Sequence, residues 1–249
     1  MYFNRGGVQA EADREERRGR RRLGRVSEPR VLSVNVGRPM VQRVPKGRST
    51  GIGKRPVDVI TVADPGPKRV EDGAGVSGVA GDHIGDGRHH GGSDQAVYAF
   101  AREELDAWAR ELGRELPSGI FGENLTTSGI DVDASEIGDV WYVGTAVLEV
   151  RGPRVPCATF AERMGERGWV KRFAAHGRSG AYLQVVRPGE IRPGDTIAVE
   201  PSGSGLGVPT VLRAFLGDPG AARTAIDSGA LAEHRVAELA ATAQRDTGR

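Results

Sequence analysis

The chain has 249 residues, of which 38% are hydrophobic, 5% are aromatic and 37 are glycine. This length suits one large domain or two small ones, and many glycines with few aromatic residues favour short strands and tight turns over a helix bundle. The formal net charge is +2, but residues 1–30 hold nine Arg against five Asp or Glu. The basic character therefore belongs to the N-terminal segment, and the rest of the chain is slightly acidic.

Residues 1–30 are predicted to be a disordered Arg-rich arm, because runs such as REERRGRRRLGR are typical of solvated tails. Two alternatives are a nucleic-acid contact made by this arm and an over-long start with folding from Val31. No apolar run approaches the roughly 20 residues that span a bilayer, and no apolar segment of a signal peptide follows the N-terminal arginines. One cysteine excludes an internal disulfide. These features favour a cytoplasmic protein with no membrane segment.

The first strand pattern is VLSVNVG at residues 31–37, where apolar and small polar residues alternate. A second strand region covers residues 50–62, with Pro56 at an edge or a bulge. The Gly- and Pro-rich residues 65–82 are predicted as turns. The strongest helix pattern is SDQAVYAFAREELDAWARELG at residues 93–113, with Ser93 or Asp94 capping its start and Gly113 ending it.

Strand patterns return at residues 139–152 and 181–200, with two short helices between them around Gly165 and Gly168. From Thr210 the pattern is that of two or three short helices, with Asp218–Pro219 as a cap and first-turn pair and Ser228 as another cap. The sequence thus predicts an α+β chain that is mainly β. It has a disordered arm at 1–30, a barrel or sandwich at 31–200 and a helical C-terminal appendix at 201–249.

Cys157 follows a predicted strand in RGPRVPCATF and comes after Pro153 and Pro156, which stiffen the chain. Arg154 can favour its thiolate, which is the form that attacks or binds a metal. The alternative is a small buried hydrophobic residue.

The segment HHGGSD (89–94) allows a metal site, a phosphate site or a plain surface turn. Adjacent histidines diverge, so joint zinc binding is disfavoured. The predicted helix start would instead favour an anion, with Arg88 and the imidazoles as donors and the two glycines allowing close approach. STGIGKRP (49–56) offers Lys54 and Arg55 for a phosphate in the same way. In FGENLTT (121–127), Glu123 and Asn124 stand at a strand entrance, where they can tie down a loop or orient a ligand.

Taken in order, SVNVGRP, TGIGKRPV, HHGGSDQAVY, FGENLTT, RVPC and IRPGDTI resemble the MOSC domain (molybdenum cofactor sulfurase C-terminal domain), in particular its YiiM-like, stand-alone bacterial branch. The resemblance spans about residues 33–199. It implies a MOSC-type mixed β-barrel that binds molybdenum cofactor. Cys157 matches the family cysteine expected to ligate molybdenum or carry sulfur. The cofactor pocket would include a set of polar residues: Lys54, Arg55, Arg88, His89, His90, Asp94, Glu123, Asn124 and Arg154.

The resemblance further implies a molybdenum-dependent oxidoreductase that reduces N-hydroxylated small molecules such as hydroxylaminopurines. The sequence has no GxGxxG motif after a strand and no four-cysteine cluster, so we expect no flavin, haem or iron–sulfur centre of its own. Electrons would come from a separate flavin or iron–sulfur reductase. The alternative is a non-catalytic carrier of molybdenum cofactor or of a persulfide on Cys157. Pyridoxal phosphate binding is only a family-level association, and no domain for it is recognisable. We expect a monomer or homodimer.

Overall fold

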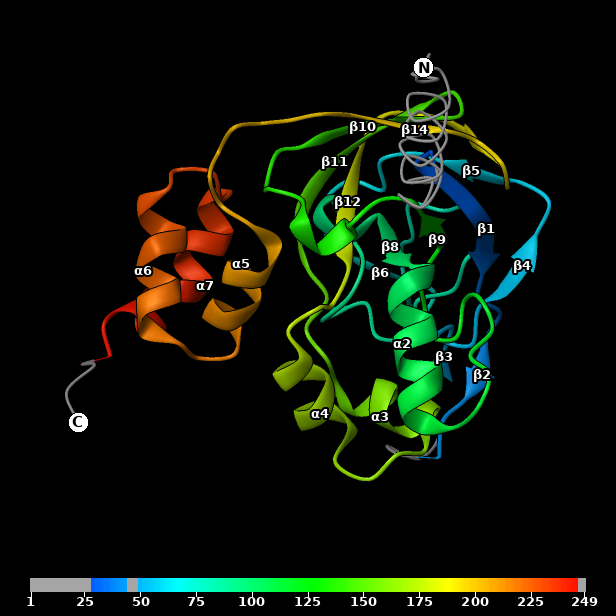
Figure 1. Cartoon of the computed structure of the whole chain (residues 1–249), viewed down its shortest axis with the longest axis horizontal. Coiled ribbons are helices and arrows are strands. Elements are labelled where there is room, and N and C mark those ends of the chain that lie inside the picture. The colour runs from blue at the N-terminus through cyan, green and yellow to red at the C-terminus, as the bar shows by residue number, and fades with distance from the viewer. Residues whose placement is uncertain (1–27, 44–48, 246–249) are drawn as a thin grey trace, which may run out of the picture.

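The computed structural model describes residues 28–43 and 49–245, so the predicted arm lies outside the described residues except for its last three positions. Eight strands form the main sheet in the order β14-β10-β11-β12-β8-β9-β1-β4 (Figure 1). Their bounds are β1 Arg30–Val36, β4 Arg55–Val57, β8 Val97–Ala101, β9 Leu125–Ser128, β10 Val140–Val143, β11 Ala146–Pro153, β12 Ala181–Arg187 and β14 Ile197–Glu200. Pro56 lies in β4, which pairs only with β1, so its predicted edge position is confirmed.

Three small two-stranded ladders accompany the main sheet, pairing β13 with β5, β2 with β3, and β6 with β7. Their bounds are β2 Met40–Val41, β3 Ser49–Thr50, β5 Ile60–Val62, β6 Val70–Glu71, β7 Ala74–Gly75 and β13 Gly189–Ile191. Backbone hydrogen bonds also join the start of β1 to the turn before β14, from the Val31 N–H to the Asp195 carbonyl and from the Ile197 N–H to the Pro29 carbonyl. The strand ladders themselves leave β14 and β4 at the two ends of the order, so the closed barrel stays a prediction.

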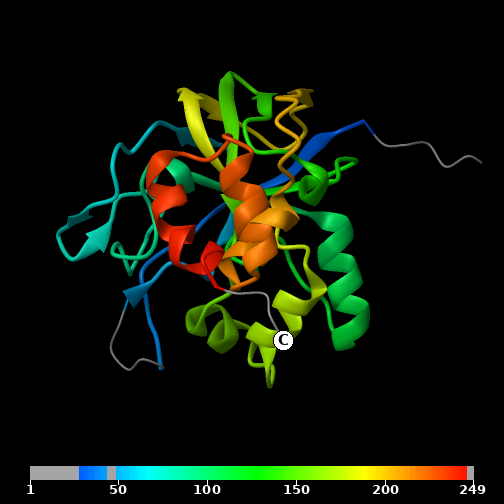
Figure 2. The ribbon, with the colours of Figure 1, turned by 90° about the vertical axis from the view of Figure 1, so that its left-hand side faces the viewer.

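Six α-helices lie in two groups on the described part of the chain. Helices α2 (Arg102–Leu112), α3 (Ala158–Met164) and α4 (Trp169–His176) pack beneath the sheet in the view of Figure 1. Helices α5 (Val208–Phe215), α6 (Pro219–Asp227) and α7 (Glu233–Ala243) form the predicted C-terminal appendix, which faces the viewer in Figure 2. Within residues 28–43 and 49–245, no helix has the length and apolar character needed to cross a bilayer.

The predicted helix at residues 93–113 is wrong in its first half. Residues 93–95 form a short 3-10 turn, residues 97–101 form strand β8, and α2 begins only at Arg102. All five β8 residues are buried, because the strand pairs with β12 on one side and β9 on the other. Sheet pairing therefore overrides the helical spacing of Val97 and Phe100. The predicted end is confirmed, since Gly113 caps α2 with a φ of 64°.

The two caps predicted in the C-terminal helices also have different outcomes. Asp218 caps α6 by accepting hydrogen bonds from the backbone N–H groups of Gly220 and Ala221, with Pro219 in the first turn, as predicted. Ser228 instead ends α6 at its C-terminal side, and Ala232 precedes α7.

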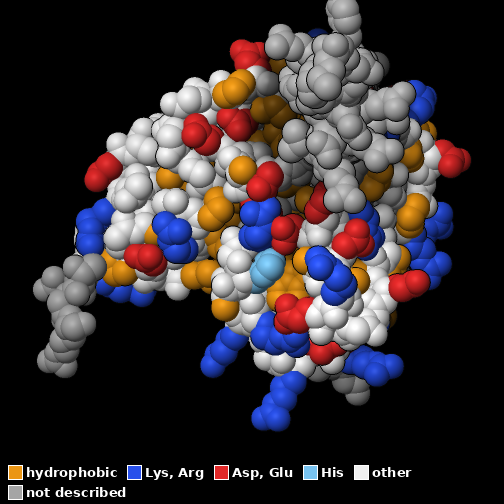
Figure 3. Space-filling view, in the orientation of Figure 1, with side chains coloured by type: hydrophobic (Ala, Val, Ile, Leu, Met, Phe, Trp, Pro, Cys, Tyr) orange, Lys and Arg blue, Asp and Glu red, His pale blue; other side chains and the backbone are white. Residues whose placement is uncertain are grey.

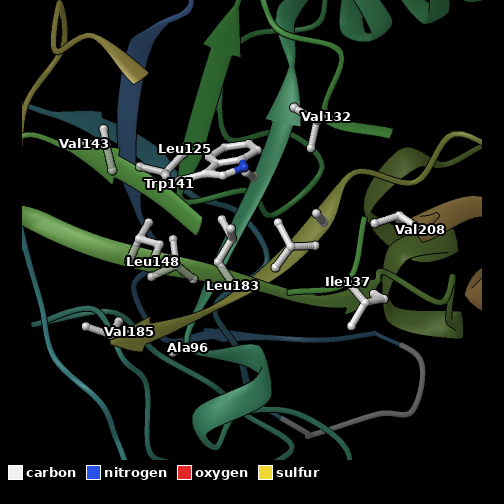
Figure 4. Close-up of a cluster of buried hydrophobic side chains, with 14 of the residues drawn as sticks. Ala96, Leu125, Val132, Ile137, Trp141, Val143, Leu148, Leu183, Val185 and Val208 are labelled. Atoms are coloured by element: carbon white, nitrogen blue, oxygen red, sulfur yellow. The ribbon is translucent and has the colours of Figure 1, made fainter. Parts of the chain in front are cut away.

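Two clusters of buried side chains make the core. One lies around Trp141, where Leu125, Leu148 and Leu183 converge from different strands (Figure 4), and it continues to Val208 at the start of α5. The other is aromatic and joins β8 to α2, α3 and α4, with the Phe121 ring centroid 5.0 Å from that of Phe160. The segment from β11 to α3, which carries Cys157, runs from the first cluster to the second and is fixed at both ends.

The folded surface in Figure 3 mixes the two signs of charge, with Asp and Glu side chains beside Lys and Arg across the visible face. A surface that binds nucleic acid through phosphates usually carries one sign of charge over a continuous patch. The visible face of the folded body therefore gives no support to a nucleic-acid contact.

Candidate functional site

A pocket of about 120 Å³ opens beside the thiol of Cys157. We refer to it as the Cys157 pocket and define it by Lys54, His83, His90, Arg154, Cys157 and Tyr182. Four of the residues singled out from the sequence, Lys54, His90, Arg154 and Cys157, are thus brought together from three separate stretches of chain. Any polar ligand that enters this pocket meets a thiol, two imidazoles and two cationic groups.

Cys157 is held in place by the chain on both sides of it. Strand β11 ends at Pro153, and Pro156 is buried immediately before the cysteine. Cys157 itself is half-buried, has an extended backbone with φ −135° and is the residue that precedes α3. The strand–proline–helix arrangement expected from the sequence therefore places one thiol at a fixed point.

Arg154 is the most unusual group of the pocket. Its side chain is 6% exposed, and it makes no ion pair with any described residue, while its Nη1 atom has no hydrogen-bond acceptor. The guanidinium carbon lies 3.7 Å from the centroid of the Phe160 ring and 5.6 Å from that of Tyr98. Cation–π contact offsets part of the cost of burial, but a buried charge with an unused donor still favours an acceptor that is supplied by a ligand.

Lys54, which lines the pocket, forms a buried ion pair with Asp82, and their side chains are 8% and 2% exposed. The Asp82 carboxylate also accepts hydrogen bonds from the Gly37 N–H, at 2.7 Å, and from the Asn124 amide, at 3.1 Å. It therefore ties the end of β1, the segment before β4 and the start of β9 to one point. Lys54 adds positive potential to the pocket, although its charge is already paired.

His90 lies at the mouth of the pocket in its neutral form. Burial, and after it the Arg154 charge, lowers the pKa of His90 from 6.5 to about 4. A neutral imidazole offers one donor and one acceptor. His90 can therefore exchange a hydrogen bond with a ligand without adding a further charge beside Arg154.

Because the pKa of His90 is lowered by folding, the free energy of unfolding should depend on pH. Between about pH 6.5 and about pH 4, the unfolded chain protonates His90 and the folded chain does not, so the free energy of unfolding falls as the pH falls through this window. Urea unfolding of the wild type and of His90→Gln near both ends of the window should show a larger loss for the wild type. Equal losses, or a ring NMR titration midpoint near 6.5, would contradict the prediction.

A second hollow of about 590 Å³ adjoins the Cys157 pocket and shares His90, Cys157 and Tyr182 with it. We refer to it as the outer groove. One wall is the Pro153–Pro156 loop, and the other is made by Phe215 and Leu231 of the C-terminal appendix. The appendix thus helps to form the approach to Cys157, which the sequence alone did not indicate.

Asp94 lies in the outer groove but is engaged by neighbouring basic side chains. Its carboxylate is 2.8 Å from Nε2 of His234, 3.4 Å from Nε of Arg235 and 3.3 Å from Nε of Arg151. These contacts fasten α7 to β11. The structure therefore gives Asp94 a role in holding the appendix against the body.

Glu123 and Asn124 stand behind the pocket and tie down backbone. Glu123 accepts hydrogen bonds from the N–H groups of Gly119 and Phe121 and from the Thr126 hydroxyl, while burial raises the pKa of its carboxyl. Asn124 accepts from the Tyr98 N–H, and its amide donates to Asp82. Of the two roles that the sequence allowed, the structure shows the loop-fixing one.

The remaining predicted site residues lie farther out. Arg88 and His89 line the outer groove and are exposed; the His89 ring is 2.9 Å from the Asp86 carboxylate. Arg55 lines neither hollow and faces a different groove, which also contains Arg38 and Arg163. The structure thus separates Lys54 from its neighbour Arg55.

The helix start predicted directly after the histidines is wrong, because a three-residue 3-10 turn and then strand β8 follow them. Anion binding by this segment therefore has no helix N-terminus to support it and stays a prediction. The two glycines have a different use. Gly91 and Gly92 have φ angles of 87° and 79°, and a Cβ atom on them would lie 2.8 Å from the Val76 carbonyl and 2.9 Å from the Lys68 nitrogen. They let the chain just after β7, at Val76, and just before β6, at Lys68, pack closely against this turn.

Sequence reasoning missed His83, which lines the Cys157 pocket, and Asp82, which pairs with Lys54 of that pocket. Nε2 of His83 lies 2.6 Å from the Ser49 hydroxyl, and Asp82 is adjacent to His83 in the chain. The signal available was an Asp–His pair at the end of a Gly-rich segment, but its importance depends on contacts with Lys54 and Asn124 that are distant in sequence. Among the described residues, no group of three or more His, Cys, Asp or Glu side chains is placed to hold a metal ion.

Comparison with known proteins agrees with this geometry. A family model described as the MOSC domain matches residues 86–198, which include the histidine turn and Cys157. YflK of Bacillus subtilis (strain 168) is 33% identical over 165 residues, covering 66% of this chain and 70% of that protein. The chain belongs to the MOSC domain family.

Two further proteins are similar to this MOSC protein, one compared by structure and one by sequence. The crystal structure of YiiM from Geobacillus stearothermophilus superposes with a TM-score of 0.66 at 26% identity, covering 86% of this chain and 98% of that one. A protein named reductase from Gibberella moniliformis (strain M3125 / FGSC 7600) is 35% identical over 147 residues, which are 55% of this chain and 26% of that protein. The fold of the MOSC protein is thus the YiiM-like one over most of its length.

Proposed function

We propose that this MOSC protein binds molybdenum cofactor in the Cys157 pocket and reduces N-hydroxylated small molecules with electrons from a separate flavin or iron–sulfur reductase. The observation that carries the proposal is Arg154, a buried guanidinium without a carboxylate partner in the same pocket as the thiol. Membership of the MOSC family and the likeness to a protein named reductase support the redox assignment.

The residues present fit this cofactor. A thiolate is a soft ligand suited to a transition metal, and Cys157 is presented at the pocket wall. The unused donor of Arg154 suits an anionic or carbonyl oxygen of the cofactor, and Lys54 adds positive potential. When bound, the cofactor supplies the redox-active metal for two-electron cleavage of an N–O bond.

The chain itself would bind and orient the substrate. Phe215, Leu231 and the Pro153–Pro156 loop give the outer groove apolar walls that suit a flat heterocycle such as a purine base. Neutral His90 lies where the groove meets the Cys157 pocket and can hold a hydrogen bond to the N–OH group. Reduction of an N–OH group to an amine takes up two protons and releases water, and the open groove connects the pocket to solvent for both.

A carrier of molybdenum cofactor, or of a persulfide on Cys157, is the second candidate. The observation in its favour is that Cys157 lines both hollows, so a partner can approach the thiol from the outer groove. The two candidates differ in turnover, because only the enzyme converts N-hydroxylamines to amines repeatedly.

The decisive experiment is to produce the chain in a host that makes molybdenum cofactor and to measure bound molybdenum by elemental analysis. Reduction of hydroxylaminopurine is then followed with a flavin reductase and NADH. Near-stoichiometric metal with turnover supports the enzyme, and metal or labile sulfur without turnover supports the carrier. Absence of metal, under conditions that load a known molybdoenzyme, contradicts the cofactor assignment.

Arg154→Met should separate binding from folding. The substitution removes a buried donor that has no protein acceptor and keeps an apolar side chain of similar length, so we expect the free energy of unfolding to change by no more than about 1 kcal/mol. Bound molybdenum should fall about tenfold or more, because charge-assisted hydrogen bonds contribute about 1.5–3 kcal/mol. Arg187→Met, at an exposed arginine outside both hollows, is the control. Unchanged metal content in Arg154→Met would contradict the role given to Arg154.

A further inference from the structure

A third hollow, of about 1090 Å³, lies apart from the Cys157 pocket and shares no residue with it. We refer to it as the arginine groove, because Arg38, Arg55 and Arg163 line it. These arginines come from the loop after β1, from β4 and from α3. Apolar side chains complete the walls, among them Met40, Val57 and Val59. Neither the proposed redox chemistry nor the internal hydrogen bonds of the fold explain why three cationic groups meet here.

The charges of the arginine groove are unbalanced. None of the three arginines forms an ion pair with a residue in the ranges 28–43 and 49–245, and no acidic side chain from those ranges lines the groove. The carboxylates nearest in sequence are Glu162, beside Arg163, and Asp58, three residues after Arg55, and neither is part of the lining. Guanidinium groups do not deprotonate in proteins, so their mutual repulsion is relieved only by an anion or by solvent.

Arg163 is the inner member of the set. It is half-buried, and its Nε atom is enclosed without a hydrogen-bond partner. Burial, followed by the charges of Arg55 and Arg114, lowers its pKa, although the group stays charged. Arg38 and Arg55 are exposed at the rim. One half-buried and two exposed arginines in a single groove can donate to an anion from several sides.

We propose that the arginine groove is a binding site for a phosphate-bearing small molecule, with the phosphate between Arg163, Arg55 and Arg38. Arginine suits this ligand because its planar fork donates two parallel hydrogen bonds to phosphate oxygens. The organic part of the ligand contacts the apolar wall of Met40 and Val57. The site is independent of the cofactor assignment, which concerns the Cys157 pocket.

An acidic protein surface is the competing occupant. It would engage the exposed Arg38 and Arg55, but a flat surface makes little contact with Arg163, which is half-buried in the groove wall. A small anion enters the groove and reaches all three groups. The dependence of binding on Arg163 therefore distinguishes the two occupants.

The test is isothermal titration calorimetry of the full chain with pyrophosphate, at constant ionic strength set with sodium chloride. We expect saturable binding that Arg163→Gln weakens about tenfold or more, since charge-assisted hydrogen bonds contribute about this factor. Arg187→Gln removes one exposed charge outside the groove and should leave the affinity within about twofold. Arg55→Gln is the second variant, because its exposed position makes it tolerant of substitution even if Arg163→Gln does not fold.

Three outcomes would overturn the proposal. Equal affinities for Arg163→Gln and Arg187→Gln would show attraction by net charge alone. Loss of binding in Arg154→Gln, with Arg163→Gln unaffected, would place the anion in the Cys157 pocket. Binding of polyglutamate but not of pyrophosphate would identify an acidic protein as the occupant. None of these results bears on molybdenum content, so failure of this site and failure of the cofactor assignment are distinguishable.

Discussion

Cys157→Ser is expected to lower the rate of N-hydroxylamine reduction by more than about 100-fold, with a parallel loss of bound molybdenum. Removing only the outer partners of a metal ligand already costs about 10–100-fold in affinity or activity. A serine hydroxyl is a harder ligand than a thiolate and stays protonated near neutral pH. The change is nearly isosteric at a half-buried position, so the fold should be retained.

The measurement is elemental analysis together with steady-state reduction of hydroxylaminopurine by wild type, Cys157→Ser and the control Ala175→Ser. Ala175 is an exposed residue of α4, so its variant adds the same hydroxyl away from both hollows. Circular dichroism should show the same unfolding temperature for all three proteins. Full molybdenum and full activity in Cys157→Ser would remove the thiol from the mechanism and with it the main reason for placing the cofactor in this pocket.

Asp82→Asn is expected to lower the free energy of unfolding by about 3–5 kcal/mol, because removal of one partner from a buried ion pair leaves the other charge uncompensated. Lys54 is 8% exposed, and its ammonium has no acceptor other than Asp82 among the residues that the structure describes. The Oδ2 atom of Asp82 receives the Lys54 ammonium, the Asn124 amide and the Ser77 hydroxyl. An amide nitrogen in place of this oxygen would set a hydrogen-bond donor against these three donors.

Urea unfolding of Asp82→Asn and of the double variant Lys54→Met/Asp82→Asn measures this effect. We expect the double variant to recover part of the loss, since the unpaired ammonium is gone. Glu190→Gln, which breaks the exposed pair with Arg192, is the control and should change the free energy of unfolding by at most about 1 kcal/mol. A loss of less than about 1 kcal/mol in Asp82→Asn would show that water enters the site and screens Lys54.

These predictions depend on residues that the sequence revealed to different degrees. The strand–proline–cysteine pattern around Cys157 and the helices on either side of Gly165 and Gly168 are local features, and the structure has both. Arg154 was noted as a neighbour of the thiol. That it is buried without an ion pair follows from its position beneath the Phe160 ring, which the sequence does not indicate.

Strand β8 and the contacts of Asp82 are two features that local sequence patterns do not predict. The spacing in the segment VYAFA predicts a helix, but its pairing with β12 and β9 makes it a strand. Asp82 lies in a segment predicted as turns, yet it binds the Gly37 backbone and the side chains of Lys54 and Asn124. Long-range contacts of this kind leave no periodic pattern in the chain.

The sequence by itself determined the MOSC family, the mainly β body with its helical appendix, and the place of the single cysteine. These depend on local chain chemistry and on motifs that occur in order. Only the tertiary structure decided that Lys54, His90 and Arg154 share a pocket with Cys157 and that Arg55 faces a separate groove. It also decided that Asp94 fastens α7 to the body. The physical reason is that burial, ion pairing and desolvation depend on which distant segments meet, and those distances are set by the packing of the sheet and helices.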